Sequence, residues 1–231
     1  MAAAFLGAAW CLLLGGLLDG DPMLVIEFAG GVLAGAWAIL VIRDVAAARR
    51  LGAALAVDSE QASLFGVRCR VTPALGVHAL VLGAIRPQIF IGTRLLAGFA
   101  QDELKAVVYH EDHHRRTRAP LRASALAAWL RLLGRSERVR TIVDERLMDL
   151  ETMADADAIR RGSSASSLAR ALLKGDLSPQ PVAFSYATDR RVEHLLERAA
   201  GSTGVDTRRL PYEWLPVALL TVASLACHVG L

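Results

Sequence analysis

The sequence has few of the residues that mark a disulfide-stabilised or nucleic-acid-binding protein. Its three cysteines, Cys11, Cys69 and Cys227, have no pair spacing, and two of them lie in apolar segments. We therefore expect neither a disulfide framework nor a cysteine zinc site, which agrees with a reducing compartment. The net charge is only +3 and aromatic residues do not alternate with basic ones, so no nucleic-acid partner is expected. The sequence also lacks internal repeats and a low-complexity tail.

Hydrophobic residues, by contrast, are abundant. They make up 54% of the 231 residues and give a mean hydropathy of +0.38, which is high for a soluble protein. Charged residues make up 21% of the chain, too large a share for a polytopic transporter. The composition therefore predicts a mainly α membrane protein with a few spans and one soluble domain.

Two apolar segments near the N-terminus predict a hairpin of transmembrane helices over residues 1–43. Residues 1–18 carry no charge, a turn with two acids follows, and residues 23–42 are again apolar except for Glu27. These lengths suit helices that cross a bilayer. A signal peptide over residues 1–20 is the competing interpretation, although that stretch lacks a basic start and a clear cleavage site. Glu27 lies near the end of its segment, where an interfacial position is expected.

Basic residues set the expected orientation in the membrane. Arg43, Arg49 and Arg50 follow the second segment, whereas the turn before it holds acids and no base. The positive-inside rule then places the N-terminus and the domain over residues 44–212 in the cytoplasm. Residues 213–231 form a third apolar segment that would leave the cytoplasm. We therefore expect a multi-pass protein of the cell membrane, with the lipid bilayer as one partner.

The stretch Tyr109–Arg116 contains the pattern His-Glu-x-x-His, formed by His110, Glu111 and His114. Two histidines with this spacing on a helix lie one turn apart, so both imidazoles can reach one metal ion. The glutamate between them does not share their direction and is placed to deprotonate a water rather than to bind the metal. The pattern alone matches many unrelated chains, so it needs a helix and a third ligand as support.

The residues around the motif favour a helix within residues 94–118. Asp102 and Glu103 would lie in its first turn, where acids are favourable. Apolar residues then recur with helical spacing at Leu104, Val107 and Val108. The basic residues at the end of this segment suit a helix C-terminus, or they contact anionic lipid headgroups, and both interpretations stay open. These basic residues are Arg115, Arg116 and Arg118.

A second predicted helix, over residues 148–158, supplies the third ligand. Glu151 and Asp155 lie one turn apart on one face, with alanines beside them. A carboxylate from a second helix commonly completes a two-histidine zinc site and leaves a fourth position open for water. The carboxylate one turn later is placed to orient a ligand.

The two motifs together resemble those of the integral-membrane gluzincin peptidases, which include HtpX, the CAAX prenyl proteases and the BlaR/MecR antibiotic-sensor peptidases. The resemblance covers residues 65–200, and the run before the motif is most similar to the BlaR/MecR-type branch. It implies a zincin-like α+β metallopeptidase domain and a zinc-dependent endopeptidase that cleaves a protein or peptide substrate. By analogy, the substrate is a transcriptional repressor or a small membrane protein.

The resemblance also implies roles for individual residues. His110, His114 and Glu151 would bind Zn2+, and Glu111 would be the general base and acid. Asp155 would hold a ligand histidine, and Arg191 would stabilise substrate or oxyanion.

The chain departs from the family pattern at two places. Ser185 stands where the prenyl-protease branch has a histidine, which favours the BlaR/MecR-type branch and leaves the transition-state donor open. Asp112 and His113 stand where the family has an apolar and a small residue. His113 could compete with His114 as a ligand, although the intact spacing favours His114. An inactive membrane scaffold or regulator, and a metal sensor that uses three histidines, are the alternative functions.

The remaining segments give coarser expectations. We expect a helix over residues 44–57, a loop over 58–66 and a small antiparallel sheet or a pair of hairpins over 67–91. The edge of that sheet would hold an extended substrate, or the sheet would only cover the core. After the motif, the sequence predicts an amphipathic helix, a charged connection or helix start, a short helix and a loop, over residues 119–134, 135–146, 163–174 and 175–190 respectively.

Overall fold

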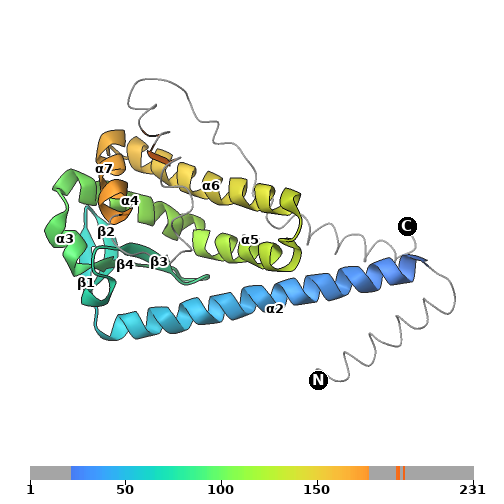
Figure 1. The fold of residues 1–231 in the computed structure, drawn as a ribbon. Coiled ribbons are helices and arrows are strands. Elements are labelled where there is room, and N and C mark those ends of the chain that lie inside the picture. The colour runs from blue at the N-terminus through green and yellow to red at the C-terminus, as the bar shows by residue number, and fades with distance from the viewer. Residues whose placement is uncertain (1–21, 177–190, 193–194, 196–231) are drawn as a thin grey trace. The chain divides into compact units, whose positions relative to one another are not determined.

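The computed structural model describes residues 22–176, 191–192 and 195 (Figure 1). The chain divides into two compact units, one formed by Met1–Ile42 with Leu210–Leu231 and the other by Arg43–Arg209. The spans predicted over residues 1–18 and 213–231, and the loop predicted after residue 176, lie outside the described residues.

Helix α2, Pro22–Val57, joins the second predicted span and the alanine-rich segment after it into one continuous helix. Within the described residues, its Phe28–Val57 portion is the one stretch that is long and apolar enough to cross a membrane. Large apolar side chains on this helix are exposed, among them Ile26, Ile39 and Ile42. The helix enters the second unit at Arg43, where the charged residues begin.

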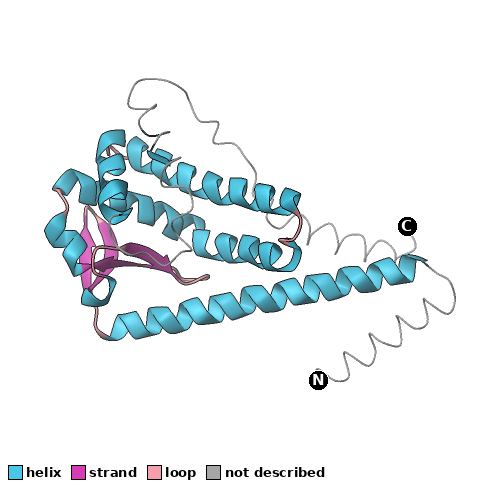
Figure 2. Ribbon diagram, in the orientation of Figure 1, coloured by secondary structure: helices cyan, strands magenta, loops and turns pink. Residues whose placement is uncertain are grey.

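The second unit contains a four-stranded sheet with strand order β1-β2-β4-β3 (Figure 2). β2 pairs antiparallel with β1 but parallel with β4, and β3 pairs antiparallel with β4. The sheet is therefore mixed: its two antiparallel pairs agree with a pair of hairpins, whereas the prediction of a wholly antiparallel sheet was wrong at the β2–β4 pair. The strands are β1 (Glu60–Leu64), β2 (Val67–Thr72), β3 (Ala79–Leu82) and β4 (Gln88–Gly92).

Strand β1 lies where the sequence predicted a loop over residues 58–66, so that prediction was wrong. The strand turns into β2 through Phe65 and Gly66, which have φ values of 51° and 79°. Positive φ at both turn residues matches the right-handed twist of a tight hairpin. Phenylalanine does not ordinarily adopt this conformation, so the turn carried no recognisable sequence signal.

The parallel pairing of β2 with β4 depends on a compact crossover. A short 3-10 helix, η1 (Pro73–Leu75), follows β2, and its first turn is capped by the Thr72 side chain, which accepts from Ala74 N. Gly76 then takes a φ of 57°, and its carbonyl lies so close to Gly92 that a Cβ there would meet it at 2.1 Å. Glycine at position 92 therefore permits this crossover to pack against the end of β4.

The second unit also contains the helices α3 (Thr93–Gly98), α4 (Gln101–Thr117), α5 (Ala119–Leu133), α6 (Glu137–Arg160) and α7 (Ala165–Asp176). Helix α4 packs against the sheet through Leu104 and Val108, which join the core formed by Val67, Ile89 and Ile91. The predicted helices over residues 119–134 and 163–174 are confirmed as α5 and α7. The predicted helix over residues 148–158 is the second half of α6, and the charged segment before it is a helix start.

Both ends of α4 are fixed by specific contacts. At the start, the Glu103 carboxylate accepts the backbone N–H of Ala100 at 3.0 Å and also binds Lys174 of α7 at 2.5 Å. At the end, Arg118 takes a left-handed conformation with φ 53° and is at once the last cap of α4 and the first cap of α5. The helix that carries the motif is thus held between the sheet, α7 and α5.

Candidate metal centre

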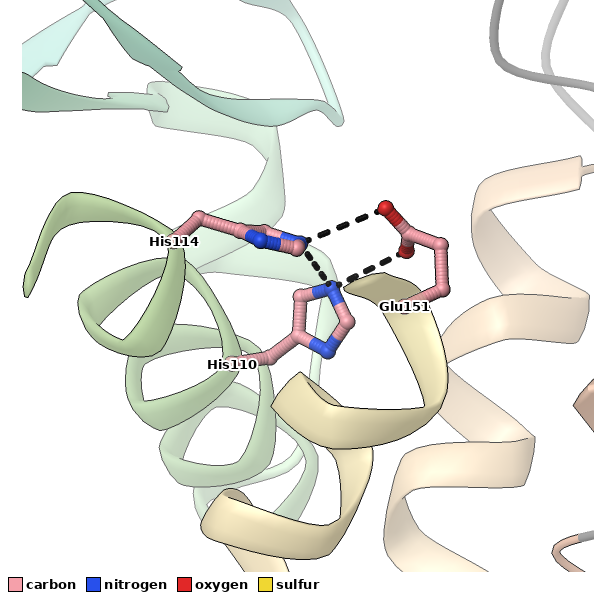
Figure 3. A group of neighbouring side chains, drawn as sticks. All are labelled: His110, His114 and Glu151. Carbon is pink, nitrogen blue, oxygen red and sulfur yellow. Dashed lines mark hydrogen bonds and ion pairs between the residues drawn. The ribbon is translucent and has the colours of Figure 1, made fainter. Parts of the chain in front are cut away.

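Helices α4 and α6 bring together the three residues predicted as metal ligands (Figure 3). His110 Nε2 and His114 Nε2 are 2.9 Å apart. The two carboxylate oxygens of Glu151 lie 3.3 Å from these nitrogens, one oxygen facing each imidazole. One ligand atom from each residue lies within 4.8 Å of the others, so the group could hold a metal ion.

Asp155 orients His110 from behind. Its Oδ1 lies 2.8 Å from His110 Nδ1, and the carboxylate is only 2% exposed. A hydrogen on Nδ1 donated to Asp155 leaves the lone pair of Nε2 directed toward His114 and Glu151. The predicted second carboxylate of α6 therefore contacts His110, one of the predicted ligands, from a position one helical turn after Glu151.

Arg191 lies against both carboxylates of α6. Its Nη1 is 2.8 Å from Glu151 Oε2, and its Nη2 and Nε contact the two oxygens of Asp155 at 2.7 Å and 3.1 Å. The contact with Asp155 is bidentate, the strongest geometry for an arginine and a carboxylate. The structure thus places Arg191 in the site, with its guanidinium bound to the site's own acids.

The charged groups of the site are in direct contact and shift one another's pKa values. Burial raises the pKa values of Glu151 and Asp155, but contacts with Arg191 and His110 lower them by more than burial raises them. Both carboxyls therefore have pKa values below their usual range. Burial lowers the pKa of His110, but the hydrogen bonds to Asp155 and Glu151 outweigh it and raise that pKa to about 10. The two ionised carboxylates therefore face Arg191 and a protonated His110, and a metal ion that binds His110 must displace its proton.

Glu111 lies next to His110 on α4 and is half-buried. Within the described residues its carboxylate has neither a hydrogen bond nor an ion pair. Its charge is close enough to Arg191 to contribute to the raised pKa of that guanidinium; burial opposes this rise, and Asp155 and Glu151 drive most of it. Among the acids of the site, Glu111 is therefore the one left free to accept a proton.

Asp112 belongs to an ion-pair network between α4 and α6. Its buried carboxylate contacts Arg115 at 2.8 Å, Arg116 at 3.3 Å and Arg161 at 2.7 Å. Arg116 also contacts Asp157 on α6. The interpretation of Arg115 and Arg116 as headgroup contacts is therefore not needed, because both side chains bind acids of their own domain.

His113 lies apart from the three converging ligands. Its Nδ1 is 3.5 Å from Asp157 Oδ2, which is too long for a good hydrogen bond. Burial lowers its pKa to about 4, despite the nearby Asp157, so the imidazole is neutral. His113 instead packs beside Asp157 at the α4–α6 interface. The ion-pair network of Asp112 could have been found from one sequence signal, which is the spacing of Asp112 from Arg115 and Arg116.

Ser185, the other departure from the family pattern, lies outside the described residues. Comparisons of the chain with family models, with curated proteins and with solved structures find no match. The arrangement of His110, Glu111, His114 and Glu151 is therefore the basis on which a function can be proposed.

Proposed function

We propose that this chain is a membrane-bound, zinc-dependent endopeptidase whose general base is Glu111. The observation that carries the proposal is the convergence of His110, His114 and Glu151 from two helices, with a free glutamate next to the first histidine. The resemblance of both motifs to membrane gluzincins supports the same reaction. Because an inactive scaffold could keep this arrangement, the proposal needs a test of turnover.

The ligand set fits zinc. Two nitrogens and one carboxylate oxygen form a common catalytic zinc set, with bonds near 2.0–2.2 Å, so tetrahedral ligand atoms lie about 3.3 Å apart. The separations here are 2.9 Å between the imidazole nitrogens and 3.3 Å from each nitrogen to a different oxygen of Glu151. Oxygen-seeking ions such as Mg2+ prefer carboxylates and carbonyls to imidazoles, so we assign the site to Zn2+.

The proposed chemistry divides among the residues of the site. Zinc, when bound, supplies a water of lowered pKa and polarises the scissile carbonyl. Glu111 accepts the proton as the water attacks and then passes it to the leaving amine. Asp155 keeps His110 in the tautomer that presents Nε2. Arg191 restrains Glu151 and Asp155, and it is our candidate for stabilising negative charge on the substrate.

The membrane placement rests on α2 and its flanking charges. The Phe28–Val57 portion has the length and composition of a span, and within it the apolar residues run up to Ile42 before the arginines begin at Arg43. By the positive-inside rule we place the metal centre on the cytoplasmic side of the cell membrane, in a multi-pass chain. The substrate is a protein or peptide that reaches this side.

The test is Glu111→Gln in detergent-purified full-length protein. The variant is expected to keep one zinc per chain by elemental analysis and to lose cleavage by at least about a hundredfold, because the proton acceptor is gone. Glu145→Gln, an exposed glutamate of α6, is the matched control and should cleave like the parent protein. Full turnover by Glu111→Gln would refute the role of the base. Absence of zinc and of turnover in the parent protein would favour the scaffold.

A further inference from the structure

We infer that the turn joining α5 and α6, with the arginines around it, binds the anionic phospholipid headgroups of the bilayer that α2 spans. This turn surface consists of Arg131, Arg135, Arg138 and Arg140, with Leu133 and Ile142 among them. The inference rests on the membrane placement proposed above, but it does not depend on zinc or on proteolysis.

The turn surface carries an unbalanced positive charge. Its four arginines are all exposed, and the segment that holds them contains one acid, Glu137. Within the described residues, Arg135, Arg138 and Arg140 form no ion pair. The arginines of the α4–α6 interface differ in this respect, since Arg116, Arg160 and Arg161 all bind Asp112 or Asp157. The turn surface therefore has guanidinium groups free for an external anion.

An ion pair fixes where this turn lies along α2. Arg131 Nη1 is 2.7 Å from both carboxylate oxygens of Asp44. The apolar stretch of α2 ends at Ile42, the last apolar residue before the charged ones. Asp44 lies two residues after it. The contact therefore holds the turn beside a residue of α2 that closely follows this stretch in sequence. Arg43 adds a further positive charge at that point of the chain.

Apolar side chains on the turn surface favour a lipid over an acidic protein as the partner. Leu133, at the end of α5, is 38% exposed, and Ile142, in α6 after the turn, is 56% exposed. Ile142 follows Arg138 by one helical turn, so the two side chains share a face of α6. Interfacial surfaces combine two kinds of residue: arginines that bind lipid phosphates and, beside them, apolar residues that enter the boundary between headgroups and acyl chains. Guanidinium groups also match phosphate geometry.

The experiment uses full-length protein in nanodiscs of phosphatidylcholine alone or of phosphatidylcholine mixed with phosphatidylglycerol. Hydrogen–deuterium exchange is measured for residues 131–142. We expect slower exchange when phosphatidylglycerol is present, and loss of this effect at high salt. Each basic residue near an anionic surface changes affinity about fivefold, so Arg135→Gln/Arg138→Gln/Arg140→Gln should abolish the dependence on phosphatidylglycerol. The corresponding lysine triple variant should retain it.

The matched control is Arg68→Gln/Arg86→Gln/Arg94→Gln, which removes the same charge from exposed arginines of the sheet, its hairpin and α3. This control should keep the slowed exchange. Exchange that does not respond to phosphatidylglycerol in the parent protein, or that responds equally in both glutamine variants, would overturn the inference. A chain that does not enter nanodiscs would refute the membrane placement as well, whereas loss of the Glu111 effect alone would refute only the peptidase.

Discussion

Replacing Asp155 tests whether a buried carboxylate prepares His110 for metal binding. Asp155→Ala removes the oxygen that lies 2.8 Å from His110 Nδ1. Loss of such a contact typically weakens metal binding 10–100-fold, or about 1.4–2.7 kcal/mol. We expect Asp155→Ala near the upper value. Asp155→Asn keeps an acceptor oxygen for Nδ1 and should lie near the lower value.

Arg191 makes the effect of this substitution larger. It contacts both Asp155 and Glu151, so removing the negative charge of Asp155 leaves Glu151 as its main partner. A guanidinium held more tightly to Glu151 competes with the metal for that ligand. Adding Arg191→Gln to Asp155→Asn should therefore recover part of the lost zinc affinity. Such non-additivity is expected for residues in direct contact.

Zinc affinity is measured by competition with a chromophoric chelator, using metal-free protein whose thermal unfolding confirms that it remains folded. Asp149→Asn is the matched control, because Asp149 also lies on α6 and pairs with an arginine, Arg146, at 3.1 Å. It should bind zinc like the parent protein. A zinc affinity for Asp155→Ala that stays within about twofold of the parent would refute the proposed orienting role.

Two further predictions concern the ligand set and its protons. Glu151→Ala should lower the zinc content measured by elemental analysis, whereas His113→Ala should leave it at one per chain, because His113 faces Asp157; the reverse result would make His113 the ligand. The pKa of His110 is raised to about 10 in the metal-free site, so zinc must displace a proton at neutral pH. Zinc affinity should therefore rise with pH up to about that pKa, and calorimetry in buffers of different ionisation enthalpy should detect about one released proton; a pH-independent affinity between pH 7 and 9 would contradict the raised pKa.

The parts of the site that were predictable from sequence are those that helical periodicity fixes. His110 and His114 belong to one helix, and Glu151 and Asp155 belong to another, so local spacing alone gave each pair a common face. The docking of the two helices was not readable, because it depends on contacts such as Arg116 with Asp157, far apart in sequence.

The sheet was harder to predict for the same reason. The pairing of β2 with β4 joins segments that are not neighbours in the chain, and its parallel direction follows from the crossover at Gly76 and Gly92. Strand β1 was missed because its turn uses Phe65, a residue with no turn propensity. The spacing of Asp112 from Arg115 and Arg116 was a local signal of this ion-pair network, but its partner Arg161 is far away in sequence, where it caps the end of α6.

Helix α6 is continuous from Glu137 to Arg160, so a movement at its start is passed along the whole helix. Its first turn adjoins the turn surface, and Glu151 lies 14 residues further along, about 21 Å away at 1.5 Å per residue. His110 and His114 keep their spacing whatever α6 does, since both belong to α4. A tilt or rotation of α6 as a rigid rod therefore changes the position of one metal ligand against the other two. If the turn surface binds headgroups as we infer, a force exerted there would move Glu151 relative to the two histidines and so change the affinity of the proposed site for a metal ion.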